Sequence, residues 1–344
     1  MKTDTGLTNC SGTLIVNQIN NIKKIVEENN SFLIAAHENP DCDALGSTLA
    51  LGIGLLSIGK DVDLFNNDTT PDHLKFLPEW NRVINNTDSL KKSYDCIFLL
   101  DSADDMRPGL NFHEYVKTTE YIKKIVIDHH NTNNNNDELV WVDINAASTG
   151  VMVYKLLNAL GVEVTKNIST LIFSTIVGDT GSFRYSNTNS EAFKIASELV
   201  ESGAEPEHVA QAIYENEPLK KINLIGKALN TLEIDDTKKI ASVYIDNTMY
   251  SDTGTTREDT EGIINIPRRI NGISVAMLLR QENDENDPVN KWKISLRSKF
   301  DVDVSAIAKK FGGGGHVKAS GLTITGDLDK VKTTLVEAIK EEIV

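Results

Sequence analysis

Short apolar runs alternate with longer segments of helical periodicity between residues 31 and 202. The short runs have the length and composition of buried strands. Predicted strands cover residues 31–36, 61–65, 94–100, 121–127 and 139–142. Predicted helices cover residues 44–58, 146–160, 168–177 and 190–202, and the last has apolar residues near helical spacing at Phe193, Ile195, Ala196, Leu199 and Val200. Strands that alternate with helices predict an α/β fold with a mostly parallel sheet flanked by helices.

The pattern changes in the second part of the chain. Residues 206–234 contain two helical segments with no strand between them, which is typical of a connection between domains. Further predicted elements are strands at 239–245, 273–280, 291–297 and 321–324 and helices at 304–311 and 328–343. A chain of 344 residues also favours two domains over one. We therefore predict a larger α/β domain at 14–204, a helical linker at 205–234 and a smaller α/β domain at 235–344.

Charge and cysteine content exclude several classes of protein. The 50 acidic and 35 basic residues give a formal net charge of −15, which argues against a broad cationic surface for long nucleic acid. Cys10, Cys42 and Cys96 are too scattered for a disulfide framework or a zinc finger, so we expect a cytoplasmic protein. Residues 1–11 lack the apolar segment of a signal peptide, and no apolar run is long enough to cross a membrane. The asparagine-rich segment 131–136 is interpreted as a solvated loop.

Acidic residues and histidines follow four of the apolar segments. These residues are His37, Asp41 and Asp43 after 31–36, Asp101 after 94–100, Asp128, His129 and His130 after 121–127, and Asp179 after 171–177. A single Asp of this kind is more typical of a turn, and a single His of an ordinary surface or core residue. The carboxyl ends of parallel strands meet at one edge of a sheet, so we expect the whole set to converge. Carboxylates that lie so close raise one another's pKa unless a cation offsets their charge.

The composition of this set predicts a two-metal site. Carboxylates and imidazoles without a thiolate suit two divalent ions, with Mn²⁺ as the first choice and Mg²⁺ or Co²⁺ as alternatives. Two ions about 3.5–4 Å apart lower the pKa of a shared water and align the oxygens of a phosphoryl centre, so the predicted reaction is phosphoester hydrolysis. Cys42 lies between Asp41 and Asp43, and neighbours on an extended loop point in opposite directions. We therefore expect Cys42 to pack away from the ions.

These motifs resemble those of the DHH phosphoesterase family, which is named for the triplet found here as Asp128, His129 and His130. Residues 37–47, 100–103 and 178–181 resemble the other motifs of its catalytic domain. The resemblance implies one ion held by His37, Asp41 and Asp101, and a second held by Asp43, Asp101, His129 and Asp179. It also implies that Asp101 bridges the ions, that His130 polarises the scissile phosphate, and that Asp128 orients an imidazole without binding metal.

The second part of the chain resembles the C-terminal domain associated with this family, through residues 295–298, 312–316 and 319–321. A glycine run alone is more typical of a flexible turn. With the resemblance, the expected substrate-binding residues are Arg297, Ser298, Gly313, Gly314, Gly315 and His316, together with Asn39 of the first motif. The fork-shaped Arg297 guanidinium suits a phosphate, and the glycines can present backbone N–H groups to a phosphate or sugar. Arg268 and Arg269 are expected to add positive potential or to be ordinary solvated residues.

The length and the glycine-rich element resemble the branch that degrades very short RNA oligomers and removes the 3′-phosphate from phosphoadenosine phosphate. The expected substrates are therefore short oligonucleotides, dinucleotides or phosphoadenosine phosphate, with no long nucleic acid and no membrane as partner. Two alternatives stay open: hydrolysis of cyclic or linear di-AMP, and a non-catalytic nucleotide-binding regulatory module. A non-catalytic module would be expected to lack a metal ligand, and all six expected positions are filled. A homodimer is expected from the resemblance alone.

Overall fold

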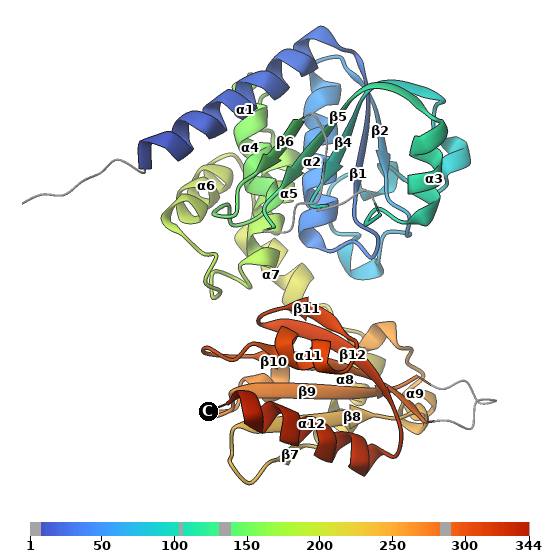
Figure 1. Ribbon diagram of the computed structural model, residues 1–344. Helices are drawn as coiled ribbons and strands as arrows, with labels where there is room; N and C mark the ends of the chain where they lie inside the picture. Colours follow the sequence, from blue (N-terminus) through green and yellow to red (C-terminus); the bar gives the residue numbers. More distant parts are fainter. Residues whose placement is uncertain (1–7, 103–105, 131–138, 283–289, 344) are drawn as a thin grey trace, which may run out of the picture. The chain divides into compact units, whose positions relative to one another are not determined.

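The chain forms two compact units, each built on one sheet with helices on both of its faces (Figure 1). A computed structural model describes residues 8–102, 106–130, 139–282 and 290–343, so the asparagine-rich segment 131–136 lies outside the described residues. Unit 1 comprises Met1–Asn216 and unit 2 comprises Glu217–Val344. The predicted α/β fold class is confirmed, and the division falls inside the segment predicted as a linker. The domain limits themselves stay a prediction.

Unit 1 contains a six-stranded parallel sheet with the order β3-β2-β1-β4-β5-β6. Its strands are β1 (Ser31–Ala36), β2 (Asp61–Phe65), β3 (Val83–Ile84), β4 (Ser93–Leu100), β5 (Glu120–Asp128) and β6 (Leu139–Val142). Its helices are α1 (Thr8–Glu28), α2 (Cys42–Ser57), α3 (Leu110–Thr118), α4 (Thr149–Ala159), α5 (Lys166–Asp179), α6 (Ser190–Glu201) and α7 (Pro206–Tyr214), with short 3₁₀ turns at Asp72–Leu74, Trp80–Arg82 and Thr87–Ser89. The strand order reverses between β1 and β4, which is where open α/β sheets bind ligands.

Alternation of side chains along the strands gives unit 1 a core on each face of its sheet. Phe32 and Phe98 belong to the core on the face covered by α2, α4 and α5, where their ring centroids lie 6.0 Å apart. Leu33 and Leu99 belong to the core on the other face, with Phe112 of α3. The helices of the first face pack closely: a Cβ added at Gly150 would lie 2.0 Å from the Thr175 hydroxyl. Burial on both faces explains why the central strands are apolar throughout.

Unit 2 contains a six-stranded mixed sheet with the order β11-β12-β10-β9-β8-β7. Its strands are β7 (Glu233–Ile234), β8 (Ile240–Ile245), β9 (Val275–Gln281), β10 (Lys291–Ser298), β11 (Gly314–His316) and β12 (Ala319–Thr325). Its helices are α8 (Leu219–Leu229), α9 (Asn247–Thr253), α10 (Asn265–Arg268), α11 (Val304–Lys310) and α12 (Leu328–Glu342), with a 3₁₀ turn at Glu258–Thr260. Helices α11 and α12 cover one face, and α8, α9 and α10 cover the other (Figure 1).

Several elements differ from the sequence prediction, and three of the differences have a clear physical reason. Helix α1 was not predicted, although Ile15, Ile19 and Ile22 recur at helical spacing and contact the core of unit 1. Strand β11 was not predicted either, because its glycines carry no hydrophobic pattern. Helical spacing grouped Phe193 and Val200 with the apolar stripe of α6, but these side chains are 56% and 41% exposed. Helical periodicity predicts which side of a helix is apolar, but it does not predict where the buried part of that side ends.

Among the described residues, every helix is too short or too polar to span a membrane.

Candidate metal centre

The ends of three adjacent strands place the candidate metal ligands of unit 1. Ala36 of β1 pairs with Leu100 of β4, and Leu100 pairs with Ile127 of β5, so the three strands end side by side. His37 follows β1 directly, and Asp101 follows β4 directly. The first-motif, second-motif and triplet residues therefore meet at the carboxyl edge of the sheet, next to the reversal of strand order.

The functional atoms of these residues lie within a few ångströms of one another. His37 Nε2 is 3.4 Å from Asp101 Oδ2 and 3.9 Å from Asp41 Oδ1. His129 Nε2 is 3.7 Å from the other Asp101 oxygen, Oδ1. The two oxygens of Asp101 thus face different imidazoles, so this carboxylate lies between the two candidate ion sites.

A second group of ligands surrounds His129. Its Nε2 lies 3.1 Å from Asp179 Oδ2 and 3.7 Å from Asp43 Oδ2. Three sets of side chains could each enclose a metal ion, since their ligand atoms lie within 4.8 Å of one another: His37, Asp41 and Asp101; Asp43, His129 and Asp179; and Asp101, His129 and His130. The first two sets correspond to the two predicted ion sites.

Backbone hydrogen bonds hold two of the aspartates in place. Asp41 is the N-cap of α2, and its Oδ1 accepts hydrogen bonds from the backbone N–H groups of Asp43 and Ala44, at 2.9 Å each. Asp43 is almost fully buried and accepts from the N–H groups of Thr149 and Gly150, at 2.7 and 2.9 Å. These N–H groups form the first turn of α4, where the helix dipole favours an anion.

Two residues of the metal loops adopt the left-handed backbone region without being glycine. Asn39 has φ +52°, and its N–H donates to Asp68 Oδ2 at 2.6 Å. Asp101 also has φ +52°, and its N–H donates to the Ile127 carbonyl at 3.0 Å. Such conformations persist only where surrounding contacts hold them, and they concentrate at functional sites. Asn39 therefore shapes the first-motif loop, and its substrate contact stays a prediction.

Two histidines are oriented as metal ligands usually are. His37 Nδ1 lies 2.7 Å from the Glu38 carbonyl, and His129 Nδ1 lies 3.3 Å from the Ala146 carbonyl. A ring that donates its Nδ1–H to a carbonyl presents the Nε2 lone pair to a metal. In both rings Nε2 faces the carboxylates.

His130 is oriented differently. Its Nδ1 lies 2.8 Å from Asp128 Oδ1, which also accepts from the His130 backbone N–H at 2.9 Å. Nδ1 lies 3.2 Å from Asp101 Oδ1 as well. Asp128 is buried, and its second oxygen has no hydrogen-bond partner among the described residues. The Asp128 carboxylate therefore holds the His130 ring in place, which fits a role toward substrate better than a role as ligand.

The carboxylates of this centre are an unfavourable set unless positive charge accompanies them. Burial, together with the charges of Asp101 and Asp179, raises the pKa of Asp43 well above its usual range. Burial would also raise the pKa of Asp101, but hydrogen bonds from His130 and His37 hold it well below that range. Positive charge on the imidazoles would offset this negative charge, and divalent cations would do the same.

The carboxylates around the imidazoles raise the pKa values of two histidines. Hydrogen bonds to Asp101 and Asp128 raise the pKa of His130 to about 10. Burial would lower the pKa of His129, but its contact with Asp179 and the charge of Asp43 raise it to about 9. The donor set consists of carboxylate oxygens and imidazole nitrogens without a thiolate, and it fits hard or intermediate divalent ions.

Cys42 lies beside the metal loops without joining the ligands. Its thiol is buried, and Sγ lies 3.3 Å from the Ser174 carbonyl in α5. It is also part of the core under α2. The expectation that Cys42 is a packing residue agrees with this position.

Sequence reasoning missed two residues that support the centre. The Thr149 hydroxyl lies 3.2 Å from Asp101 Oδ1, and its N–H holds Asp43. The buried Asn66 side chain donates to the His37 carbonyl at 2.8 Å. Ser148 caps α4 by accepting from Val151 N–H, and this serine before an apolar helix is the sequence signal that could have drawn attention to Thr149.

Comparison with known proteins tests the resemblance. Residues 31–176 match the DHH family, N-terminal domain, and residues 237–344 match the DHHA1 domain. The chain belongs to the DHH family. It is 32% identical over 312 residues to the bifunctional oligoribonuclease and PAP phosphatase NrnA of Thermus thermophilus, covering 90% of this chain and 89% of that protein. The family predicted from the motifs is confirmed. Phosphoesterases of this family depend on metal ions.

Two further relatives span nearly the whole chain. The NrnA protein of Bacillus subtilis is 27% identical over 318 residues, covering 90% of this chain and 95% of that protein. An exopolyphosphatase-related protein from Bacteroides fragilis has the same fold, with a TM-score of 0.87 and 25% identity over 94% of this chain and 96% of that one. Both DHH-family units therefore occur together in these relatives.

The predicted substrate-binding residues of the DHHA1 unit lie on β10 and the β11–β12 hairpin. Arg297 is half-buried on β10, and its Nη1 donates to the Leu296 carbonyl at 3.1 Å. Ser298 is buried, and its hydroxyl donates to the Val302 carbonyl at 2.8 Å. The Ser298 hydroxyl thus already stabilises a turn, whereas its substrate contact stays a prediction, as does that of Arg297.

Close packing of the hairpin explains two glycines of the glycine run. A Cβ at Gly313 would lie 2.3 Å from the Gly321 carbonyl oxygen, and one at Gly315 would lie 2.6 Å from the Ala319 oxygen. Gly315 also has φ +136°, whereas a Cβ at Gly314 would meet open space. His316 is exposed at the end of β11, on the edge of the sheet. The fold therefore requires Gly313 and Gly315, and the contact of the glycines with a phosphate stays a prediction.

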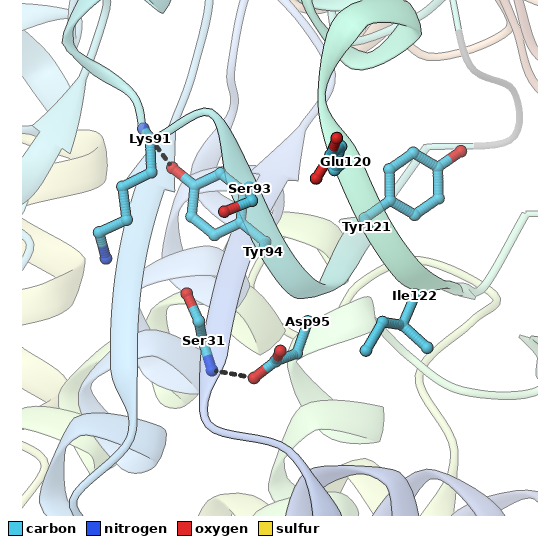
Figure 2. Close-up of a pocket in the computed structure, with 8 residues that line it drawn as sticks. All are labelled: Ser31, Lys91, Ser93, Tyr94, Asp95, Glu120, Tyr121 and Ile122. Carbon is cyan, nitrogen blue, oxygen red and sulfur yellow. Dashed lines mark hydrogen bonds between the residues drawn. The ribbon is translucent and has the colours of Figure 1, made fainter.

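A pocket of about 630 Å³ lies at the opposite edge of the DHH sheet, at the amino ends of β1, β4 and β5. Figure 2 shows its lining residues, among them Ser31, whose N–H donates to Asp95, and Lys91, whose N–H donates to the Tyr94 hydroxyl. The Tyr94 hydroxyl in turn donates to Asp63 at 2.6 Å. These polar groups pair with one another, and the metal ligands lie at the other edge, so this pocket is not the candidate site.

Proposed function

We propose that the chain is a divalent-metal-dependent phosphodiesterase that hydrolyses short oligoribonucleotides and dinucleotides to nucleoside monophosphates. Removal of the 3′-phosphate from phosphoadenosine phosphate is part of the same proposal, because both reactions cleave a phosphoester of a small nucleotide. The observation that carries the proposal is the position of Asp101, whose two oxygens face His37 on one side and His129 on the other. The names of the NrnA relatives support the substrate class.

The protein's own side chains have distinct roles in this proposal. His37, Asp41 and Asp101 hold one ion, and Asp43, His129 and Asp179 hold the second together with Asp101. Bound divalent ions supply an activated water and stabilise developing negative charge on phosphoryl oxygens. His130, held by Asp128 at 2.8 Å, offers a charged donor to a phosphate oxygen.

Mn²⁺ is the proposed ion, because a mixture of carboxylates and imidazoles suits it, with Mg²⁺ or Co²⁺ as alternatives. The net charge of −15 supports a small substrate held by a local site and not a long nucleic acid. We place the protein in the cytoplasm, because Cys42 and Cys96 are buried free thiols.

A substrate panel tests this function. Purified protein with Mn²⁺ should release nucleoside monophosphates from dinucleotides of different sequence and AMP from phosphoadenosine phosphate, and excess chelator should stop these reactions. Cyclic di-AMP and pyrophosphate complete the panel, because preferential hydrolysis of the cyclic dinucleotide would assign the chain to that alternative. Binding of dinucleotide without hydrolysis under every metal condition would instead support the non-catalytic regulatory module and contradict the proposal.

A further inference from the structure

A pair of aromatic side chains follows the metal ligand Asp179 and lies partly in solvent. The rings of Phe183 and Phe193 are stacked, with centroids 5.0 Å apart and planes 17° from parallel. Phe183 is half-buried and packs on the core of unit 1, whereas Phe193 on α6 is 56% exposed. One face of the Phe193 ring therefore rests on Phe183, and much of the remaining ring meets water.

The backbone that positions Phe183 is strained. Gly181, Ser182 and Phe183 have φ values of +55°, +59° and +60°, so three consecutive residues are left-handed. For a residue with a side chain this conformation costs roughly 1–2 kcal/mol. Thr180 holds the turn: its hydroxyl accepts from the Phe183 N–H at 2.9 Å, and its carbonyl accepts from the Arg184 N–H at 2.9 Å. Strain that the surroundings maintain in this way is typical of functional segments.

The turn is tied to the metal centre. Asp179 closes α5, and four residues span at most about 14 Å even when fully extended. The Asn187 side chain donates to the Asp179 carbonyl at 3.2 Å and to the Ala147 carbonyl at 2.9 Å, next to the Ala146 carbonyl that His129 contacts. The aromatic pair therefore lies within the length of a short oligonucleotide from the candidate ligands, in the same unit.

We propose that Phe193, supported by Phe183, is a stacking platform for a nucleobase of the substrate. This inference rests on the proposed function and adds a residue that distinguishes nucleotides from other phosphoesters. A base stacked on an aromatic side chain is worth roughly 1–3 kcal/mol, and every base has a π-face, so such a platform tolerates different sequences. The platform holds the base while the metal centre acts on the phosphate.

The test compares two substrates that differ only in a base. Wild type, Phe193→Ala, Phe193→Trp and the control Val200→Ala are assayed with linear di-AMP and with its abasic counterpart, which has the same phosphates. Val200 is exposed on the same helix and 41% accessible. We expect Phe193→Ala to raise KM for di-AMP about tenfold with little change in kcat, to leave KM for the abasic substrate unchanged, and to be rescued by Phe193→Trp.

The variants are expected to fold, because alanine favours a helix and the replaced ring is exposed. A binding measurement without turnover is quenching of 2-aminopurine riboside monophosphate fluorescence, which Phe193→Ala should weaken and Val200→Ala should preserve. If wild type hydrolyses neither substrate, the proposed function fails. If wild type hydrolyses both and Phe193→Ala changes KM equally for both, or for neither, the platform is overturned. A change in sedimentation without a change in KM would assign the ring to a contact between copies and would also overturn it.

Discussion

Aspartates of the two units have opposite electrostatic environments. Asp235, in the β7–β8 turn of unit 2, accepts from the Thr237 hydroxyl at 2.7 Å and from the Ile240 N–H at 2.9 Å. Burial would raise the pKa of Asp235, but these and neighbouring hydrogen bonds lower it to about 2. In unit 1, burial and neighbouring negative charges raise the pKa of Asp43 and of Asp41.

This difference separates a structural carboxylate from a candidate metal ligand. Asp235 finds enough N–H and O–H donors within its own turn to favour the ionised form. Asp43 also accepts two backbone N–H groups, but Asp101 and Asp179 lie around it and each adds negative charge. Hydrogen bonds stabilise one buried charge, whereas several like charges need positive charge among them. The acidic cluster of unit 1 is therefore the candidate place for divalent cations.

The largest expected effect follows from removing the shared carboxylate. Asp101→Ala removes carboxylate oxygens from both candidate ion sites. Hydrolysis of linear di-AMP with Mn²⁺ should therefore fall by more than roughly 100-fold, which is the loss typical of changing a residue that only supports a metal ligand. The matched control is Asp95→Asn at the opposite edge of the same sheet, where the carboxylate accepts from the Asn30 and Ser31 N–H groups. Near-normal turnover by Asp101→Ala would contradict the metal assignment.

The second-largest expected effect is the stabilisation of the folded protein by metal binding. At an Mn²⁺ concentration 100 times its Kd, we expect about 2.7 kcal/mol of additional unfolding free energy, measured as a higher Tm than with chelator. At a fixed Mn²⁺ concentration the increment should grow from pH 6 to pH 8, because the raised pKa of His129 means that a proton competes with the ion for this ligand. Equal Tm values with Mn²⁺ and with chelator would show that the acidic cluster needs no cation.

The contribution of the structural carboxylate Asp235 should depend on pH in a more acidic range. The folded pKa of Asp235 lies near 2, below the ordinary value of 3.8, so its contribution is present above pH 4 and is lost as pH falls toward 2. Asp235→Asn should therefore cost about 2 kcal/mol of unfolding free energy at pH 7, and the gap to wild type should narrow below pH 4 in urea titrations. Asp236→Asn is the control, since the Asp236 side chain is 79% exposed. If the difference in unfolding free energy between Asp235→Asn and wild type does not change with pH, the lowered pKa of Asp235 does not stabilise the fold.

The smallest expected effect concerns the predicted phosphate grip in unit 2. Arg297→Ala should raise KM for linear di-AMP about tenfold, the equivalent of roughly 1.4 kcal/mol, while hydrolysis of an activated generic phosphodiester stays near wild type. Lys293→Ala is the matched control, because Lys293 is an exposed cation on the same strand. Equal loss on both substrates would show that Arg297 serves the chemistry or the fold and not substrate binding.

The sequence predicted the site best where the position of a residue at the end of a strand fixes its place in the fold. Strand ends could be predicted from apolar runs, so His37, Asp101 and Asp128 could be assigned to one edge of a sheet before any coordinates. Prediction failed where a contact between distant segments decides the outcome. The N–H groups of Thr149 and Gly150 hold Asp43 across more than 100 positions of the chain, at 2.7 and 2.9 Å, and no local pattern contains that pairing.

The sequence by itself determined the α/β class, the family motifs and the chemical types of the candidate ligands, because strand length, periodicity and donor chemistry are properties of short segments. Only the tertiary structure decided which Asp101 oxygen faces which histidine, that His130 is held by Asp128, and that Phe193 lies in solvent against Phe183. These outcomes depend on side-chain directions set by packing among elements far apart in the chain. Periodicity within one element does not contain that information.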